Sequence, residues 1–141
     1  MSMRMWKIYG YGINDDDLNP STDKQIEFIK KYIPEAFKDM PQGGDTHDIQ
    51  EWIDKFEDNY GYTGFPALFA LAIANNEPDF NVAYYSCDGY GAIMYEDRQP
   101  FDMTERERHM TQDDMDTIFL RYINDLSVDA RPGRVSVEFY G

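Results

Sequence analysis

The fold can be worked out from one stretch of the sequence, residues 80–95, FNVAYYSCDGYGAIMY. Alternate residues from Phe80 to Tyr84 are large and apolar, which is the period of two expected of a β-strand. Asp88-Gly89 follows, a dipeptide that adopts positive φ at low cost and therefore predicts a tight turn. The strand pattern resumes over 92–95. We predict a β-hairpin here, and we expect its strands to be the central ones of a sheet.

Two further strands are predicted near the ends of the chain. The first is Met5 to Ile13, MWKIYGYGI, with Trp6, Ile8 and Tyr11 as candidates for burial. Its two glycines, at 10 and 12, predict a bend or a close approach by a neighbouring backbone. The last strand is Arg134 to Tyr140, in which apolar and polar residues alternate.

Four segments have the apolar spacing or composition of helices. The first begins near Thr22 and ends or kinks at Pro34, and the second runs from Asp45 or Thr46 to Tyr60. The third covers 65–74, which is apolar on every side and therefore predicts a buried helix. The fourth is capped by Thr111 and continues to 126. The predicted order is β-α-α-α-β-β-α-β. It describes a single α+β domain over 1–141, with a four-stranded, mostly antiparallel sheet and helices packed on one face.

The net charge is the most unusual global property of the chain. Twenty-seven acidic residues against 13 basic ones give −14, divided into −6 over residues 1–60 and −8 over 61–141. A surface this negative repels phosphate backbones and membranes, and it attracts basic proteins. We therefore predict no direct nucleic-acid binding and no membrane association. A requirement for solubility alone would also explain this acidity.

Compartment and chemistry follow from what the sequence lacks. The single cysteine, Cys87, excludes an intramolecular disulfide, and the N-terminus has no apolar signal run, so we expect a soluble, intracellular protein. No phosphate-binding loop, nucleophile elbow or zinc motif occurs. His47 and Glu51 have the spacing of two ligands on one helix face, but without a second histidine nearby they are interpreted as surface residues. We predict no cofactor, no metal and no catalytic residue.

Three acidic groups are the candidate partner-binding surfaces. A calcium loop at the first group fails in register, because counting from Asp15 places Pro20 at the glycine position and Ile26 at the bidentate acid. We therefore interpret that group as an exposed connection. The second group lies on the polar face of the second helix, and the third lies in the first turn of the last helix, where the helix dipole already favours acids. The three groups are Asp15, Asp16 and Asp17; Asp48, Glu51, Asp54 and Asp58; and Asp113, Asp114 and Asp116.

Several segments together resemble a known group of proteins. They are WKIYGYGI near the start, CDGYGAIMY, the Pro100-Phe101-Asp102 triplet, MTERE, and the helix MDTIFLRYINDL. These segments are similar to small acidic proteins encoded by prophages and other mobile elements of Gram-positive and gut bacteria. The triplet departs from the pattern, which has Trp and Glu where this chain has Phe101 and Asp102. The shared segments determine the fold and carry no functional residue over.

The resemblance implies a setting for the protein, the cytoplasm of a bacterial host cell. Proteins of this kind often bind host defence or replication enzymes, and inhibitors of CRISPR effectors are among them. The expectation is a non-enzymatic inhibitor that binds a basic surface of such an effector, and nucleic-acid mimicry is one way to do so. The alternative is a homo-oligomeric accessory protein of a mobile element whose acidity serves only solubility. The sequence does not indicate the oligomeric state.

Overall fold

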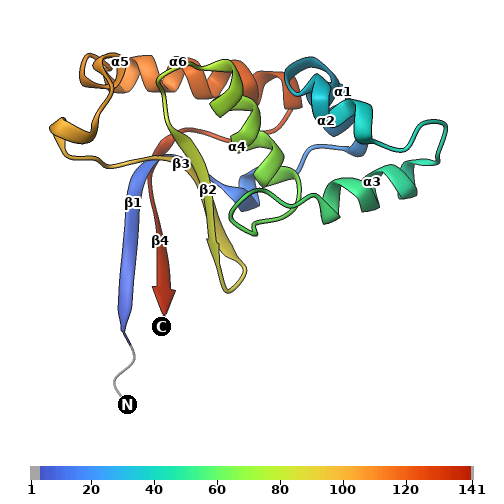
Figure 1. Cartoon of the computed structure of the whole chain (residues 1–141), viewed down its shortest axis with the longest axis horizontal. Coiled ribbons are helices and arrows are strands. Elements are labelled where there is room, and N and C mark those ends of the chain that lie inside the picture. Colours follow the sequence, from blue (N-terminus) through green and yellow to red (C-terminus); the bar gives the residue numbers. More distant parts are fainter. Residues whose placement is uncertain (1–3, 141) are drawn as a thin grey trace.

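The structure is a computed structural model that describes residues 4–140, and it has the predicted α+β architecture (Figure 1). The predicted order of elements is confirmed, with two short helices added to it. None of the described helices is both long enough and apolar enough to cross a lipid bilayer. The helices and strands are β1 (Met5–Asn14), α1 (Thr22–Tyr32), α2 (Pro34–Asp39), α3 (Thr46–Lys55), α4 (Phe65–Asn76), β2 (Val82–Cys87), β3 (Tyr90–Glu96), α5 (Glu105–Arg108), α6 (Gln112–Ile123) and β4 (Gly133–Tyr140).

The predicted hairpin is present as β2 and β3, which pair antiparallel with Cys87 opposite Tyr90. Asp88 and Gly89 both have positive φ, 54° and 77°, as a two-residue hairpin turn of the type that matches strand twist requires. The strand order is β2-β3-β1-β4, and all pairings are antiparallel. The expectation that both hairpin strands are central is therefore wrong. Of the two hairpin strands only β3 is central, because β1 pairs with the far side of β3 and β2 is left at the edge of the sheet.

β1 is long enough to take part in two halves of a strongly bent sheet. Its first part pairs with β4, and its last residues, from Gly10 onward, pair with β3. The glycines permit this bend: a Cβ on Gly12 would lie 1.9 Å from the carbonyl oxygen of Ile93, and one on Gly10 would lie 2.4 Å from that of Tyr95. Of the two alternatives predicted for these glycines, the close approach of a neighbouring backbone is confirmed.

The bend lets the sheet cover part of its own second face. Although β4 pairs only with β1, it also lies against β2 and β3. A small second core of Ala92, Met94 and Val137 is buried there. The expected burial of Trp6 is wrong, because its side chain remains 49% exposed and stacks on Phe139 where the two strands project beyond the helices.

The main core lies between the helices and the other face of the sheet. The prediction of a buried helix over 65–74 is confirmed by α4, in which seven of the 12 side chains are buried. Pro66 occupies the first turn of α4, where its missing N–H costs no hydrogen bond. Strand residues such as Ile13 and Ile93 contact this layer from below. Burial of this much apolar surface is the main stabilising contribution to the fold.

Two helical segments differ from the prediction. After Pro34 the chain begins a new helix, α2, because proline at the first helical position is compatible with helix although it ends the preceding one. The second predicted helix, α3, ends at Lys55 and not at Tyr60. The chain instead makes a tight turn there, in which the Asp58 carboxylate accepts hydrogen bonds from the backbone N–H groups of Tyr60 and Tyr62. Tyr60 is 82% exposed as a result.

A buried carboxylate connects the helices to the start of β2. Glu77 follows α4 and is 5% exposed. It accepts hydrogen bonds from Arg106 of α5 at 2.9 Å, from Arg121 of α6 at 2.8 Å and from the hydroxyl of Tyr122 at 2.8 Å. Two guanidinium groups balance the carboxylate, so the charge is buried at acceptable cost. Glu77 thereby fixes where α4 ends and the chain turns toward the edge strand.

Candidate functional site: a groove along the free edge of the sheet

The first acidic group, Asp15, Asp16 and Asp17, forms a single turn of 3-10 helix after β1. Asp16 and Asp17 are exposed, as expected. Asp15 is not a free surface group, because it is half-buried and accepts a hydrogen bond from the hydroxyl of Tyr84 at 2.8 Å. Burial raises the pKa of the Asp15 carboxyl, and burial together with Asp15 raises the pKa of Tyr84 to about 12. Asp15 therefore positions β2.

The second group is split by the early end of α3. Asp48, Glu51 and Asp54 are exposed on the helix, as predicted. Glu51 pairs with Lys55 at 2.6 Å, and Asp54 accepts a hydrogen bond from Gln50 at 2.9 Å. The placement of Asp58 on the same helical face is wrong, because its carboxylate is engaged in the turn that follows the helix.

The third group begins α6, and its members have different roles. Asp113 is exposed. Asp114 completes a capping box with Thr111, so the predicted cap is confirmed and this carboxylate is engaged with the backbone. Asp116 is half-buried and accepts a hydrogen bond from Tyr11, whose pKa burial and Asp116 together raise to about 12.

The three groups do not form one surface. In Figure 1, α3 lies at one end of the helix layer and the start of α6 lies at the other. Within the described chain, eight of the 27 acidic side chains form ion pairs, which leaves 19 without one. The acidity is therefore a property of the whole surface.

A groove runs along the outer edge of β2. It consists of two adjoining cavities of about 190 and 630 Å³, which share Tyr60, Ala74 and residues 82–84. The end of α4 forms one wall, and the turn after α3 forms the other, with Tyr62 in ring contact with Tyr84. The groove is lined by residues that are apolar or aromatic on the α4 side and polar toward the end of β3.

The backbone of β2 faces this groove with unused hydrogen-bonding groups. Because Cys87 and Tyr90 close a two-residue turn, they form a hydrogen-bonded pair, and the antiparallel ladder alternates from there. The N–H and C=O groups of Val82, Tyr84 and Ser86 therefore point away from β3. Among residues 4–140, no other backbone or side-chain group bonds to them. A further extended strand could pair here.

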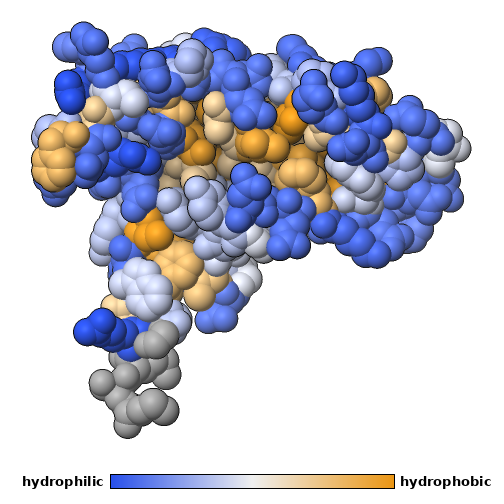
Figure 2. Space-filling model, in the orientation of Figure 1, coloured by the Kyte–Doolittle hydropathy of each residue, from blue (hydrophilic) through white to orange (hydrophobic). Residues whose placement is uncertain are grey.

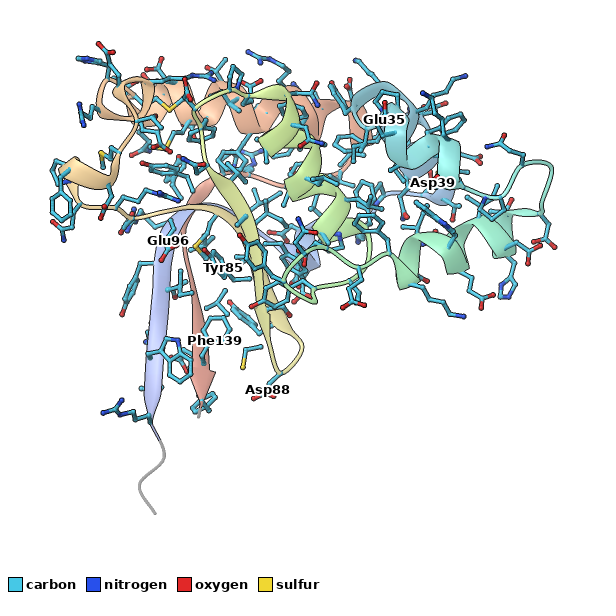
Figure 3. All side chains as sticks on the ribbon, viewed as in Figure 1. Glu35, Asp39, Tyr85, Asp88, Glu96 and Phe139 are labelled. Atoms are coloured by element: carbon cyan, nitrogen blue, oxygen red, sulfur yellow. The ribbon has the colours of Figure 1, made fainter. Side chains whose placement is uncertain are left out.

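Polar side chains gather at the end of the groove near β3. Tyr85 and Glu96 lie on the same side of the hairpin and are joined by a hydrogen bond of 2.8 Å (Figure 3). Burial, and then the Glu96 carboxylate, raises the pKa of Tyr85 well above its usual range. Arg98 lines the same cavity and forms no ion pair with the described residues, and its buried Nε has no hydrogen-bond partner there.

The start of β2 is fixed by a second buried carboxylate, Glu107 of α5. It accepts hydrogen bonds from the backbone and side chain of Asn81, at 3.1 and 3.2 Å, and from the backbone of Thr104 at 2.8 Å. Burial alone would raise the pKa of Glu107, but these hydrogen bonds to the charged form lower it below its ordinary value of 4.5.

We expect Glu107→Gln to destabilise the protein by about 1 kcal/mol at neutral pH, because the amide cannot accept all of these hydrogen bonds. Because the folded-state pKa of Glu107 is lower than the unfolded value of 4.5, the ionised carboxylate stabilises the folded state fully at pH values above 4.5. This stabilisation is lost as the pH falls through the folded-state pKa. The difference in free energy of unfolding between wild type and variant should therefore shrink in acid. Urea unfolding between about pH 7 and about pH 3 measures it. Glu105→Gln, an exposed change on the same helix, is the control. A difference that stays constant with pH would contradict this role.

The expected absence of catalysis and metal binding is not decided by the structure. No group of three or more His, Cys, Asp or Glu side chains placed to hold a metal ion occurs in the described part of the chain. His47 is exposed on α3 and Cys87 is half-buried at the end of β2.

The groove was not predicted from the sequence. The signal that could have indicated it is the segment 81–86, NVAYYS, which has strong strand propensity but no charged residue or proline.

The structure shows an α+β fold with a groove along one edge of its sheet. Comparison with protein-family models, with curated proteins and with solved structures finds no match to this chain.

Proposed function

We propose that the chain is a non-enzymatic, acidic binding protein that inhibits a host nucleic-acid-binding defence enzyme, of the kind that CRISPR effectors represent. The observation that carries the proposal is the set of 14 exposed acidic side chains that form no ion pair in the described structure. Such a surface is attracted to the basic grooves that bind DNA and RNA, and the attraction acts at long range at low salt.

The version of the proposal that involves mimicry of nucleic acid rests on a row of acidic side chains on α3. Asp48, Glu51 and Asp54 follow each other at intervals of three residues on this helix. Their Cα atoms therefore rise by about 4.5 Å from one to the next along the helix axis. Phosphates rise by about 3.4 Å along one DNA strand, so the acidic row is more widely spaced than the phosphates it would replace. The three candidate groups lie on separate elements, so α3 alone is the acidic face that this version of the proposal uses.

Retention of partners from a bacterial lysate tests the proposal. The immobilised protein should retain basic nucleic-acid-processing proteins at low salt and release them at high salt. Replacing the α3 acids together (Asp48→Asn, Glu51→Gln, Asp54→Asn) should reduce retention.

The matched control removes the same charge elsewhere. Glu35→Gln and Asp39→Asn on α2, which Figure 3 labels, with Asp129→Asn, alter exposed acids outside the candidate groups. Equal loss in both variants would contradict a role for the α3 face. Retention of no basic nucleic-acid-processing protein at low salt would contradict the function itself.

A homo-oligomeric accessory protein is the second candidate, because large apolar side chains remain exposed on the projecting strands (Figure 2). They lie away from the helices and the groove, and they include Met5, Trp6, Tyr9, Tyr90 and Tyr140, each about half exposed. Exposed apolar side chains of this size are candidates for an interaction surface. Light scattering that reports an oligomer in wild type and a monomer in Trp6→Lys would favour this function.

A further inference from the structure

We propose that the free edge of β2 is a docking site for an extended, basic peptide segment of a partner protein, which would pair with β2 as a fifth strand. The choice of a basic partner rests on the proposed function, and the docking site names the place on the molecule where such a partner is held. Strand addition of this kind gains affinity from main-chain hydrogen bonds and specificity from alternate side chains.

The edge of β2 lacks the protection that the other edge of the sheet has. Natural proteins protect free edges with charged residues, proline or bulges, because an exposed edge recruits other strands. β4 carries Arg134 and Glu138, which form ion pairs with Asp97 and Lys7. The segment 82–86 of β2 carries no charge and no proline, and it pairs without a bulge. The edge is therefore built to accept a strand.

The groove beside this edge suits one extended chain. Side chains of a strand alternate between two faces, so a bound peptide would direct one set toward α4 and the other toward the end of β3. The α4 side offers small and apolar residues: Ala67, Ala70, Leu71 and Ala74. The larger cavity adds the carboxylates of Glu96 and Asp79, and Arg98 lines it as well. An alternating apolar and basic sequence fits both rows.

Charge selects a basic peptide over a second copy of this chain. Besides Glu77, whose charge Arg106 and Arg121 balance, four acidic residues line the two cavities, and Arg98 is the only basic residue among their described lining: the four acids are Glu57, Asp58, Asp79 and Glu96. Two copies paired through β2 would bring these acids against each other and would add to a repulsion that −14 per chain already makes unfavourable. A bound basic strand instead neutralises acids in the groove and lowers the net negative charge of the complex.

The test uses the synthetic peptide acetyl-Lys-Val-Lys-Val-Lys-Val-Lys-amide and amide hydrogen exchange by NMR at moderate salt. Without peptide, the outward N–H groups of Val82 and Tyr84 should exchange fast, while those of Ala83 and Tyr85, which bond to β3, should be protected. With peptide, exchange at Val82 and Tyr84 should slow by about tenfold or more. A peptide of equal charge with proline at its centre should not have this effect, because proline cannot donate to a ladder.

Two variants control for non-specific binding to an acidic surface. Ala74→Trp fills the groove from an exposed position that lines both cavities, and it should weaken peptide binding by about tenfold. Asn75→Trp adds the same side chain at the next exposed position of α4, which lines neither cavity, and should leave binding unchanged.

Each outcome of the test decides the proposal. Unchanged exchange at Val82 and Tyr84, or equal binding by the two tryptophan variants, would overturn it. Protection that rises with protein concentration in the absence of peptide would overturn it in favour of a second copy. The peptide experiment contains no host protein, so it is independent of the lysate experiment. If the peptide does not protect β2 but the protein still retains basic proteins from a lysate, only the docking site is contradicted. If the peptide binds but no basic protein is retained from a lysate, only the inhibitor function is contradicted.

Discussion

Gly12→Ala is expected to lower the free energy of unfolding by about 3 kcal/mol or more, because the added Cβ would clash with backbone atoms that cannot shift without disturbing the sheet. A Cβ at this position would lie 1.9 Å from the carbonyl oxygen of Ile93 and 2.8 Å from the Cα of Met94, and both of these are backbone atoms of β3. β1 and β3 would have to separate where β1 bends. Urea unfolding at 25 °C measures the loss, and the yield of folded protein reports it if the variant does not fold.

The control lies directly across the ladder. Gly133 pairs with Gly12 in register, but a Cβ on Gly133 would have no atom within 4 Å. Gly133→Ala should therefore change stability by no more than about 0.5 kcal/mol, and it removes some freedom from the unfolded chain. Similar losses in the two variants would mean that the close approach of β1 to β3 is not what the first variant disturbs.

Glu77→Ala is expected to destabilise the protein by about 2 kcal/mol, because it leaves a buried hydroxyl without its hydrogen-bond acceptor. The hydroxyl of Tyr122 is the most affected, since this residue is 1% exposed and its hydrogen bond to Glu77 spans 2.8 Å. Arg106 and Arg121 lose their shared counter-ion as well. Thermal and urea unfolding measure the change.

A second variant separates the hydrogen bond from the ion pairs. Adding Tyr122→Phe to Glu77→Ala removes the unsatisfied hydroxyl and should recover part of the loss. Glu51→Ala is the exposed comparison, because its ion pair with Lys55 lies in solvent and should contribute little to stability. A cost for Glu77→Ala as small as that for Glu51→Ala would show that Glu77 does not hold the helices to β2.

The sequence could predict elements whose signals are local. The hairpin turn depends on Asp88-Gly89, and the burial of α4 depends on apolar residues on every side, so both were predictable from short windows. The end of α3 was not, because the apolar period continues to Tyr60 while the Asp58 carboxylate stabilises a competing turn.

Pairing and edges could not be predicted in the same way. Periodicity tells which residues share a face, but not which strand lies next to which, so the position of β2 at the edge depended on β1 pairing with β3. The exposure of Trp6 has the same cause, because it depends on where the helix layer stops.

The acidic groups show a similar limit. Their members were predictable as acidic, but Asp15, Asp58, Asp114 and Asp116 form hydrogen bonds within the fold that composition does not indicate. What remains exposed is the polar face of α3 and acids spread over the rest of the surface. The groove along β2 could not be predicted from the sequence, because α4, the turn after α3 and the sheet edge come together only in the folded chain.

A plasmid-interference assay measures directly whether the protein inhibits a nucleic-acid-binding defence enzyme through its acidic surface. Bacteria that carry an active CRISPR effector would be transformed with a targeted plasmid, with and without expression of the protein. The proposal predicts that transformation is restored by wild type and by the α2 and Asp129 control variant, and restored less by the α3 variant. Undiminished interference with wild type across the different effector types would contradict it.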